Sequence, residues 1–199
     1  MPDAVVFDLD GVLVDSEERW ERARCAVADS AGRPYPDDAT RVMQGMSAPE
    51  WTAYLHDELG VPDTPAEIGA RVVAEMAAGY REALPLLPGA AEAVAALAER
   101  WPLAVASSAN REIIELVLDL VGLRERFAAV VSSEEVACGK PVPDVYLEAA
   151  ARLGVDPTGC VAIETPAFPL AADALALADV TVDRVGAVTP ELVAALPAR

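Results

Sequence analysis

Short apolar segments alternate with helical patterns along most of this chain, and this alternation limits the possible folds more than any other feature. The apolar segments cover residues 4–9, 103–106, 129–131 and 160–163, and the helical patterns between them cover residues 90–100, 111–121 and 145–153. Parallel strands that are buried on both faces have such continuous apolar sequences, and helices connect them. The alternation therefore predicts an α/β fold with a parallel sheet covered by helices on both faces.

Residues 17–84 depart from this alternation, because they contain several helical stretches and no convincing strand. Glycine and proline interrupt the helical stretches at residues 32–36, 45–49 and 60–65. We interpret residues 17–84 as an inserted, all-helical cap, with residues 1–16 and 85–199 forming the core. Since the insertion follows the first strand directly, we expect it to lie over the carboxyl ends of the strands, where open α/β sheets bind ligands.

The chain is strongly acidic, with 15 basic and 33 acidic residues among 199 and a formal net charge of −18. Such a molecule repels a nucleic-acid backbone and an anionic membrane surface, so we expect neither as a partner. A small anionic substrate would need a local positive site. The chain opens on no signal-peptide pattern and contains no apolar run of membrane-spanning length, so we expect a cytoplasmic location. The oligomeric state stays open.

Three cysteines, Cys25, Cys138 and Cys160, are widely separated in the sequence. Their odd number does not fit a disulfide framework, and their spacing does not fit a zinc site. We therefore expect all three to be ordinary thiols.

Two acidic residues, Asp8 and Asp10, stand at the end of the first apolar segment, directly before Gly11. A turn opened by the glycine can aim both carboxylates into one crevice. Such crowding of negative charge is unfavourable without a cation, and Mg²⁺ held by one or two carboxylates and a substrate phosphate would relieve it. A bare pair of acids in a chain this acidic is more often a solvated loop, so the surrounding sequence decides between the two interpretations.

The segment FDLDGVLVDS, residues 7–16, resembles the first motif of the haloacid dehalogenase-like superfamily, in particular its small-capped phosphatases and phosphomutases. Residues 103–108 (LAVASS) resemble the second motif, and residues 139–144 (GKPVPD) resemble the lysine-bearing third motif. The order and spacing match, and the resemblance covers nearly the whole chain up to Glu164. It implies a Rossmann-like core and an Mg²⁺-dependent phosphatase that acts on a small phosphorylated metabolite.

The resemblance also implies catalytic roles. Asp8 corresponds to the nucleophile that forms an aspartyl-phosphate, and Asp10 to the general acid and base. Ser107 and Lys140 correspond to the groups that hold the transferring phosphoryl group. Taken alone, Ser107 is typical of a helix N-cap and Lys140 of a surface charge, so the assignment depends on their order after the first motif. For Asp144 we favour structural support of the following helix.

Further contacts to the substrate and the metal follow from the same comparison of motifs. We expect Ser108 and Gly11 to contact the substrate together with Ser107 and Lys140. The predicted ligands of the Mg²⁺ ion are Asp8, Asp10 and Glu164.

The type of reaction depends on a few positions near these motifs. The presence of Asp10 favours a phosphate ester over a halogenated compound as the substrate. A dehalogenase releases halide and has no alkoxide to protonate, so it does not need this acid. The phosphomutases that this chain resembles carry a histidine shortly after the first motif and an arginine in a cap loop, where this chain has Trp20 and Ala48. Hydrolysis is therefore the expected reaction, and a sugar-phosphate phosphomutase is an alternative.

The fourth motif departs from the family pattern, which has an acidic pair, a glycine and a helix that leads to another strand. This chain continues from Glu164 directly into Thr165, and Phe168-Pro169 with residues 171–183 resembles a later part of the pattern. We infer that one helix-and-strand unit is missing, either from the protein or from this sequence. A real loss would remove a metal ligand, so a catalytically impaired member of the family is a further alternative. A final strand near residues 180–182 would fill the vacant position or leave an exposed edge.

Four large side chains of the cap, those of Trp20, Met46, Trp51 and Tyr54, could line a substrate cavity. Aromatic residues and methionines in helices more often fill a core. We therefore favour packing as their role.

Overall fold

A parallel sheet of four strands forms the centre of the computed structural model, and the structure describes residues 1–43, 46–165 and 178–197. The strands are β1 (Ala4–Phe7), β2 (Leu103–Ser107), β3 (Ala129–Ser132) and β4 (Cys160–Ile163), in the order β3-β2-β1-β4. Val6 of β1 is paired with Ala104 on one side and with Ala162 on the other. The predicted α/β architecture is confirmed.

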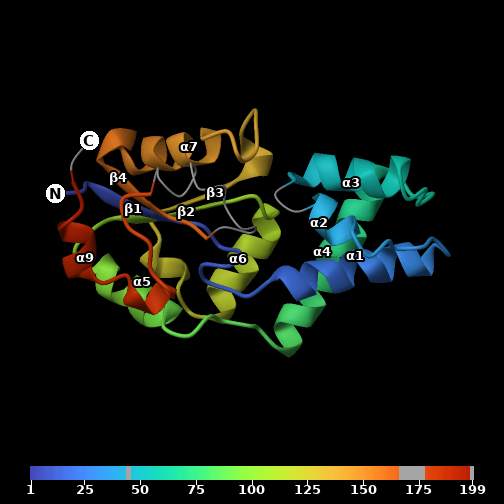
Figure 1. Cartoon of the computed structure of the whole chain (residues 1–199), viewed down its shortest axis with the longest axis horizontal. Coiled ribbons are helices and arrows are strands. Elements are labelled where there is room, and N and C mark those ends of the chain that lie inside the picture. The colour runs from blue at the N-terminus through green and yellow to red at the C-terminus, as the bar shows by residue number, and fades with distance from the viewer. Residues whose placement is uncertain (44–45, 166–177, 198–199) are drawn as a thin grey trace.

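The side chains of the strands alternate between two helical layers, as strand geometry requires. Phe7 and Val105 face the layer that contains α5 (Ala90–Ala98) and α6 (Arg111–Leu120), and their neighbours Val6 and Ala104 face α7 (Asp144–Leu153). In Figure 1, α7 accordingly runs along one side of the sheet, and α5 and α6 lie on the other. Both faces of the sheet are therefore covered, as the continuous apolar strands predict.

The strand order reverses direction at β1. The chain passes from β1 to β2 and β3 on one side of the sheet, and then returns through α7 to place β4 on the other side of β1. Open α/β sheets bind ligands at the carboxyl ends of the strands where the order reverses. The residues that follow β1 and β4 therefore occupy the position where a ligand is expected.

Four consecutive helices form the cap: α1 (Glu17–Ser30), α2 (Ala39–Met43), α3 (Ala48–Asp57) and α4 (Pro65–Glu82). Two of them begin at capping boxes, in which Ser47 pairs with Glu50 and Thr64 with Glu67. The described residues of this stretch contain no strand. The domain boundaries at residues 16/17 and 84/85 stay a prediction.

Two linkers join the cap to the core, and they run side by side. The Asp15 amide donates to the Pro85 carbonyl oxygen at 2.9 Å, and the Leu87 amide donates to the Leu13 carbonyl oxygen at 2.9 Å. Val14 and Leu86 form an antiparallel bridge between them. The outgoing and returning segments therefore form one short two-stranded ribbon.

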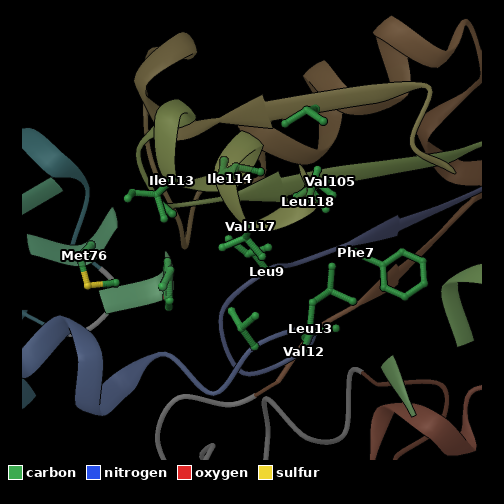
Figure 2. Close-up of a cluster of buried hydrophobic side chains, with 14 of the residues drawn as sticks. Phe7, Leu9, Val12, Leu13, Met76, Val105, Ile113, Ile114, Val117 and Leu118 are labelled. Atoms are coloured by element: carbon green, nitrogen blue, oxygen red, sulfur yellow. The ribbon is translucent and has the colours of Figure 1, made fainter. Parts of the chain in front are cut away.

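One continuous apolar cluster extends from the core into the cap. Figure 2 shows Met76 of α4 at the end of a cluster that includes Ile113 and Val117 of α6 and Phe7 of β1. Met76 is 1% exposed, and the other three side chains are fully buried. Contacts between α4 and α6 therefore fix the cap against the core.

The C-terminal segment differs from the prediction. Residues 180–182 form no strand, and Val180 and Val182 are 44% and 40% exposed. Within the described residues β4 therefore stays at the edge of the sheet, with Ala162 exposed. The chain instead forms α9 (Pro190–Ala194) beside α5, where Glu191 pairs with Arg100 at 2.6 Å. Phe168-Pro169 and residues 171–177 lie outside the described residues.

The other elements within the described residues are single turns of 3-10 helix at Arg124–Arg126, Ser133–Glu135, Pro157–Gly159 and Val185–Ala187. The three cysteines are free thiols, as predicted. Among the described helices, none is both long and apolar enough to cross a bilayer.

The shared apolar cluster predicts that the cap and the core unfold together. Met76→Ala should lower the free energy of unfolding by about 2–4 kcal/mol, because it leaves a cavity between α4 and α6. Urea denaturation should show one transition, moved to lower urea. Leu120→Ala on the exposed side of α6, where Leu120 is 45% exposed, should change the free energy by less than about 0.5 kcal/mol. Two separate transitions would contradict the prediction.

Candidate active site

The turn after β1 aims two carboxylates at the ligand end of the sheet. Asp8 and Asp10 line one cavity, while Leu9 between them is fully buried in the apolar cluster. Gly11 has φ +74°, and a Cβ atom there would lie 2.4 Å from Thr165 Cγ2. Glycine is therefore required both by the backbone and by the close approach of Thr165. Its amide donates to the Val14 carbonyl oxygen at 2.7 Å, so the turn itself uses this N–H group.

Asp8 is a buried carboxylate beside a single ammonium group. Its residue is 8% exposed, and Lys140 Nζ lies 2.9 Å from Oδ1. Burial raises the pKa of Asp8 to about 7, although the charge of Lys140 opposes this shift. Oδ1 accepts no aligned hydrogen bond from the described residues, so the contact with Lys140 is a pairing of charges. The acceptor capacity of Oδ1 therefore stays available to a ligand.

The loop that carries Lys140 is held by the helix that follows it. Asp144, the first residue of α7, accepts a hydrogen bond from the Cys138 amide at 3.2 Å. This contact fixes the start of the loop that reaches back to Asp8. Asp144 therefore supports the loop before α7, and its expected support of the helix itself stays a prediction.

Asp10 is held by two donors from different parts of the chain. Trp20 Nε1 donates to Oδ1 at 3.2 Å, and the Ser107 hydroxyl donates to Oδ2 at 3.4 Å. Ser107 is fully buried, and its hydroxyl oxygen also accepts from the Ala109 amide at 3.1 Å. Ser108, the next residue, lines the cavity, and its buried hydroxyl has no hydrogen-bond partner among the described residues. The free hydroxyl of this pair is therefore that of Ser108.

Glu164 contacts the lysine rather than completing a group of metal ligands. Its Oε1 lies 2.6 Å from Lys140 Nζ and also accepts a hydrogen bond from the Tyr146 hydroxyl. The Lys140 ammonium lies 5.0 Å from the centre of the Tyr146 ring. In the described ranges, no three acidic, histidine or cysteine side chains converge as a metal-binding group. Asp8 and Asp10 suit a hard cation, whereas Glu164 is engaged with Lys140.

A cavity of about 360 Å³ lies between the core and the cap and joins these groups. The predicted site residues that line it are Asp8, Asp10, Gly11, Ser108, Lys140 and Glu164, and Ser107 lies beneath it. On the cap side, Trp20, Met46 and Trp51 face the cavity, so packing is not their only role. Tyr54 packs against the apolar cluster, as expected.

Two contributors to this site were not predicted from the sequence. Tyr146 lies on α7, where the sequence shows only an amphipathic helix, and Arg24 lies on the polar-looking sequence of α1. Neither belongs to a motif, so spacing gives no signal for them. Only the packing of α7 brings Tyr146 to Glu164 and Lys140, and only the packing of the cap brings Arg24 to the cavity.

Comparisons with known proteins cover the whole site. A family model for haloacid dehalogenase-like hydrolases matches residues 2–164. Hexitol phosphatase B of Escherichia coli K12 is 39% identical over 167 residues, which cover 81% of this chain and 74% of that protein. The phosphorylated carbohydrates phosphatase of Thermotoga maritima is 35% identical over 164 residues, with 81% and 76% covered.

A solved structure with a similar fold covers more of this chain than the two relatives do. The beta-phosphoglucomutase of Clostridium difficile superposes with a TM-score of 0.82 over 98% of this chain and 96% of that chain, at 19% identity. An identity this low indicates a shared fold and carries no statement about the reaction.

The burial of Asp8 predicts a specific dependence of stability on pH. Because the pKa of Asp8 is about 7 in the fold and 3.8 ordinarily, its ionisation costs stability as the pH rises through this range. Without divalent cations, Asp8→Asn should raise the free energy of unfolding at pH 8 by roughly 1–2 kcal/mol. The gain should shrink towards pH 4, and chemical denaturation at both pH values measures it.

The exposed acid Asp37 provides the control, since Asp37→Asn removes a charge without relieving burial. Its effect should be small at both pH values. A gain from Asp8→Asn that is equal at pH 4 and pH 8 would contradict the proposed cost of ionisation.

Proposed function

The chain belongs to the haloacid dehalogenase-like hydrolases, and from this premise we propose that it hydrolyses a small phosphomonoester through a phosphorylated Asp8. Its relatives include phosphatases at 39% and 35% identity, and it is a phosphoric monoester hydrolase. The observation that carries the proposed mechanism is the buried Asp8 carboxylate, which shares one cavity with Lys140, Asp10 and Ser108.

The proposed reaction has two steps, each using the same two carboxylates. In the first, an Asp8 oxygen attacks phosphorus, the ester P–O bond breaks, and Asp10 gives its proton to the departing alkoxide. In the second, Asp10 takes a proton from a water molecule, the water oxygen attacks phosphorus, and the bond from phosphorus to Asp8 breaks. Inorganic phosphate is released, and both carboxylates return to their starting state.

Other residues hold the phosphoryl group during these steps. The Lys140 ammonium, 2.9 Å from Asp8, offsets the negative charge of the phosphoryl oxygens and of the carboxylate. The Ser108 hydroxyl, which is buried at the cavity wall, is the available donor for a phosphoryl oxygen. Ser107 acts through Asp10, whose carboxylate it orients. Gly11 supplies the turn and the space rather than a hydrogen bond.

The fit of Mg²⁺ rests on Asp8 and Asp10. The buried Asp8 Oδ1 without an aligned donor and the adjacent Asp10 carboxylate are the hard oxygen ligands that this ion prefers. Bound there, Mg²⁺ would offset the charge of both carboxylates and of the phosphoryl group. Glu164, the third predicted ligand, would first have to leave Lys140 and Tyr146.

This engagement of Glu164 also supports a second candidate, a protein that keeps the fold and the anion site but turns over slowly. If only Asp8 and Asp10 of the three predicted ligands bind the ion, the affinity for Mg²⁺ and the rate would both be reduced. A phosphomutase is less well supported, because the indole N–H of Trp20 can donate but cannot take up a proton as a histidine can.

The nucleophile assignment predicts the result of one substitution. Asp8→Asn should lower phosphate release from p-nitrophenyl phosphate by at least about 10³-fold, because the amide cannot form the phosphorylated intermediate. Asp37→Asn should release phosphate at the wild-type rate. Removal of divalent cations with a chelator should also stop release, and Mg²⁺ should restore it.

Three outcomes separate the candidates. Full phosphate release by Asp8→Asn would exclude Asp8 as the nucleophile. A folded wild-type chain that binds phosphate but shows no release with Mg²⁺ would favour the impaired member. Release that depends on both Asp8 and Mg²⁺ supports the phosphatase.

The hydrogen bond from Trp20 to Asp10 predicts a smaller effect. Trp20→Phe removes the N–H donor and keeps an aromatic ring, so kcat should fall about fivefold, as expected for one hydrogen bond of about 1 kcal/mol. Trp101→Phe removes an indole hydrogen bond to the Pro2 carbonyl, away from the cavity, and serves as the matched control. Equal losses in the two variants would contradict a role for Trp20 in orienting Asp10.

A further inference from the structure

The cap contributes one buried cation to the cavity. Arg24 lies on α1, is 7% exposed and lines the cavity opposite the core carboxylates. Its guanidinium carbon lies 5.1 Å from the centre of the Trp20 ring and 5.2 Å from that of Trp51. The two ring centres are 6.1 Å apart, so both indole rings lie against the guanidinium on the same side. Such cation–π contacts do not use the N–H groups of the guanidinium, which stay available to a hydrogen-bond acceptor.

No such acceptor is present in the described part of the chain. Nε of Arg24 is buried without a hydrogen-bond partner, and Arg24 forms no ion pair with a carboxylate there. Lys140, the cavity's cation from the core, lies instead between Asp8 and Glu164. Burial lowers the pKa of Arg24 to about 10, so the guanidinium stays charged at neutral pH. The charge of Asp10 favours the charged guanidinium, but Asp10 accepts no hydrogen bond from it. A buried charge without a hydrogen-bonded partner is costly, and an anionic ligand that bonded to it would recover part of this cost.

We propose that Arg24 binds a carboxylate group at the end of the substrate remote from the phosphoryl group, so that the substrate is a small phosphorylated hydroxy acid. This inference rests on the proposed phosphatase function, because it assigns the other end of the same ligand to Asp8 and Lys140. A guanidinium presents paired N–H donors whose spacing matches the two oxygens of a carboxylate.

The two ends of the cavity are within reach of one small molecule. Trp20 contacts both ends, since its Nε1 donates to Asp10 at 3.2 Å and its ring faces Arg24. The indole of Trp20 therefore extends from the carboxylate of Asp10 to the guanidinium of Arg24. A cavity of about 360 Å³ is also at the small end of the range for ligand sites.

The charges around the cavity favour a carboxylate over a second phosphate. Arg24 carries one positive charge, which a carboxylate neutralises. A phosphate carries nearly two negative charges at neutral pH, and the second would remain in a cavity that Asp10 and Asp15 also line. The charge balance therefore selects a monoanion.

The test compares two esters that differ only in the remote group. 3-Phosphoglycerate carries a carboxylate where glycerol 3-phosphate carries a hydroxymethyl group. The wild-type chain should have a kcat/KM for 3-phosphoglycerate at least about tenfold above that for glycerol 3-phosphate. Arg24→Met, which keeps an unbranched apolar side chain but removes the guanidinium, should reduce this ratio to about one. Arg24→Lys should retain part of the preference, since it keeps the charge without the paired donors.

Arg22→Met is the matched control. Arg22 lies on the same helix, and its side chain is 63% exposed and pairs with Glu18. This variant should leave the ratio as in the wild type. A purely structural role for Arg24 would lower kcat/KM for both esters equally and would leave the ratio unchanged, and that result would overturn the proposal. A wild-type ratio near one would overturn it too.

A second pair of esters tests the choice of anion. Fructose 1,6-bisphosphate and fructose 1-phosphate differ in a remote phosphate. A preference for the bisphosphate that depends on Arg24, with none for 3-phosphoglycerate, would overturn the assignment to a carboxylate.

Calorimetric binding of 3-phosphoglycerate and glycerol 3-phosphate separates failure of this proposal from failure of the phosphatase function. If no ester is turned over, but 3-phosphoglycerate binds more tightly through Arg24, the anion site stands and the phosphatase function fails. If esters are turned over with no Arg24-dependent preference, the phosphatase stands and the anion site fails. If neither turnover nor preferential binding is found, both fail.

Discussion

The pairing of Asp8 with Lys140 is the interaction on which the site depends. A carboxylate buried at the end of the central strand is costly to ionise, and the ammonium group 2.9 Å away offsets part of that cost. The fold brings the two together because β1 lies at the centre of the sheet and the loop before α7 returns over its carboxyl end. Glu164 and Tyr146 then hold the ammonium from its other side. The site therefore holds both acidic and basic groups close together. A bound cation would balance the carboxylates, and an anionic ligand would balance the ammonium group.

The cap contributes to the chemistry as well as to enclosure. Trp20 holds the Asp10 carboxylate with its N–H group, and its ring contacts the Arg24 guanidinium. A movement of α1 would therefore act on the proton-transferring group and on the buried cation together. In a chain of net charge −18, this arrangement places two buried cations, Arg24 and Lys140, in the cavity where an anion would bind.

The sequence predicts the architecture better than it predicts the walls of the cavity. Buried parallel strands leave continuous apolar runs, so all four strands of the described sheet could be located, and the motif order brought Asp8 and Lys140 together. The segment from Val180 to Val182 has a strand-like composition, but it is half-exposed and unpaired within the described residues. Strand propensity without a neighbouring partner is not enough to form a strand. Arg24 could not be predicted, because a helical pattern does not reveal which polar residue another element will bury.

The paired linkers determine how the cap can move. Because the outgoing and returning segments are hydrogen-bonded to each other, neither can bend without the other, and the cap must swing about them as about a single pivot. Such a swing would also draw Met76 away from the α6 face and expose apolar surface to water. Opening is thus opposed by hydrophobic contact on one side of the pivot, while an anion held between Lys140 and Arg24 would oppose it from within the cavity.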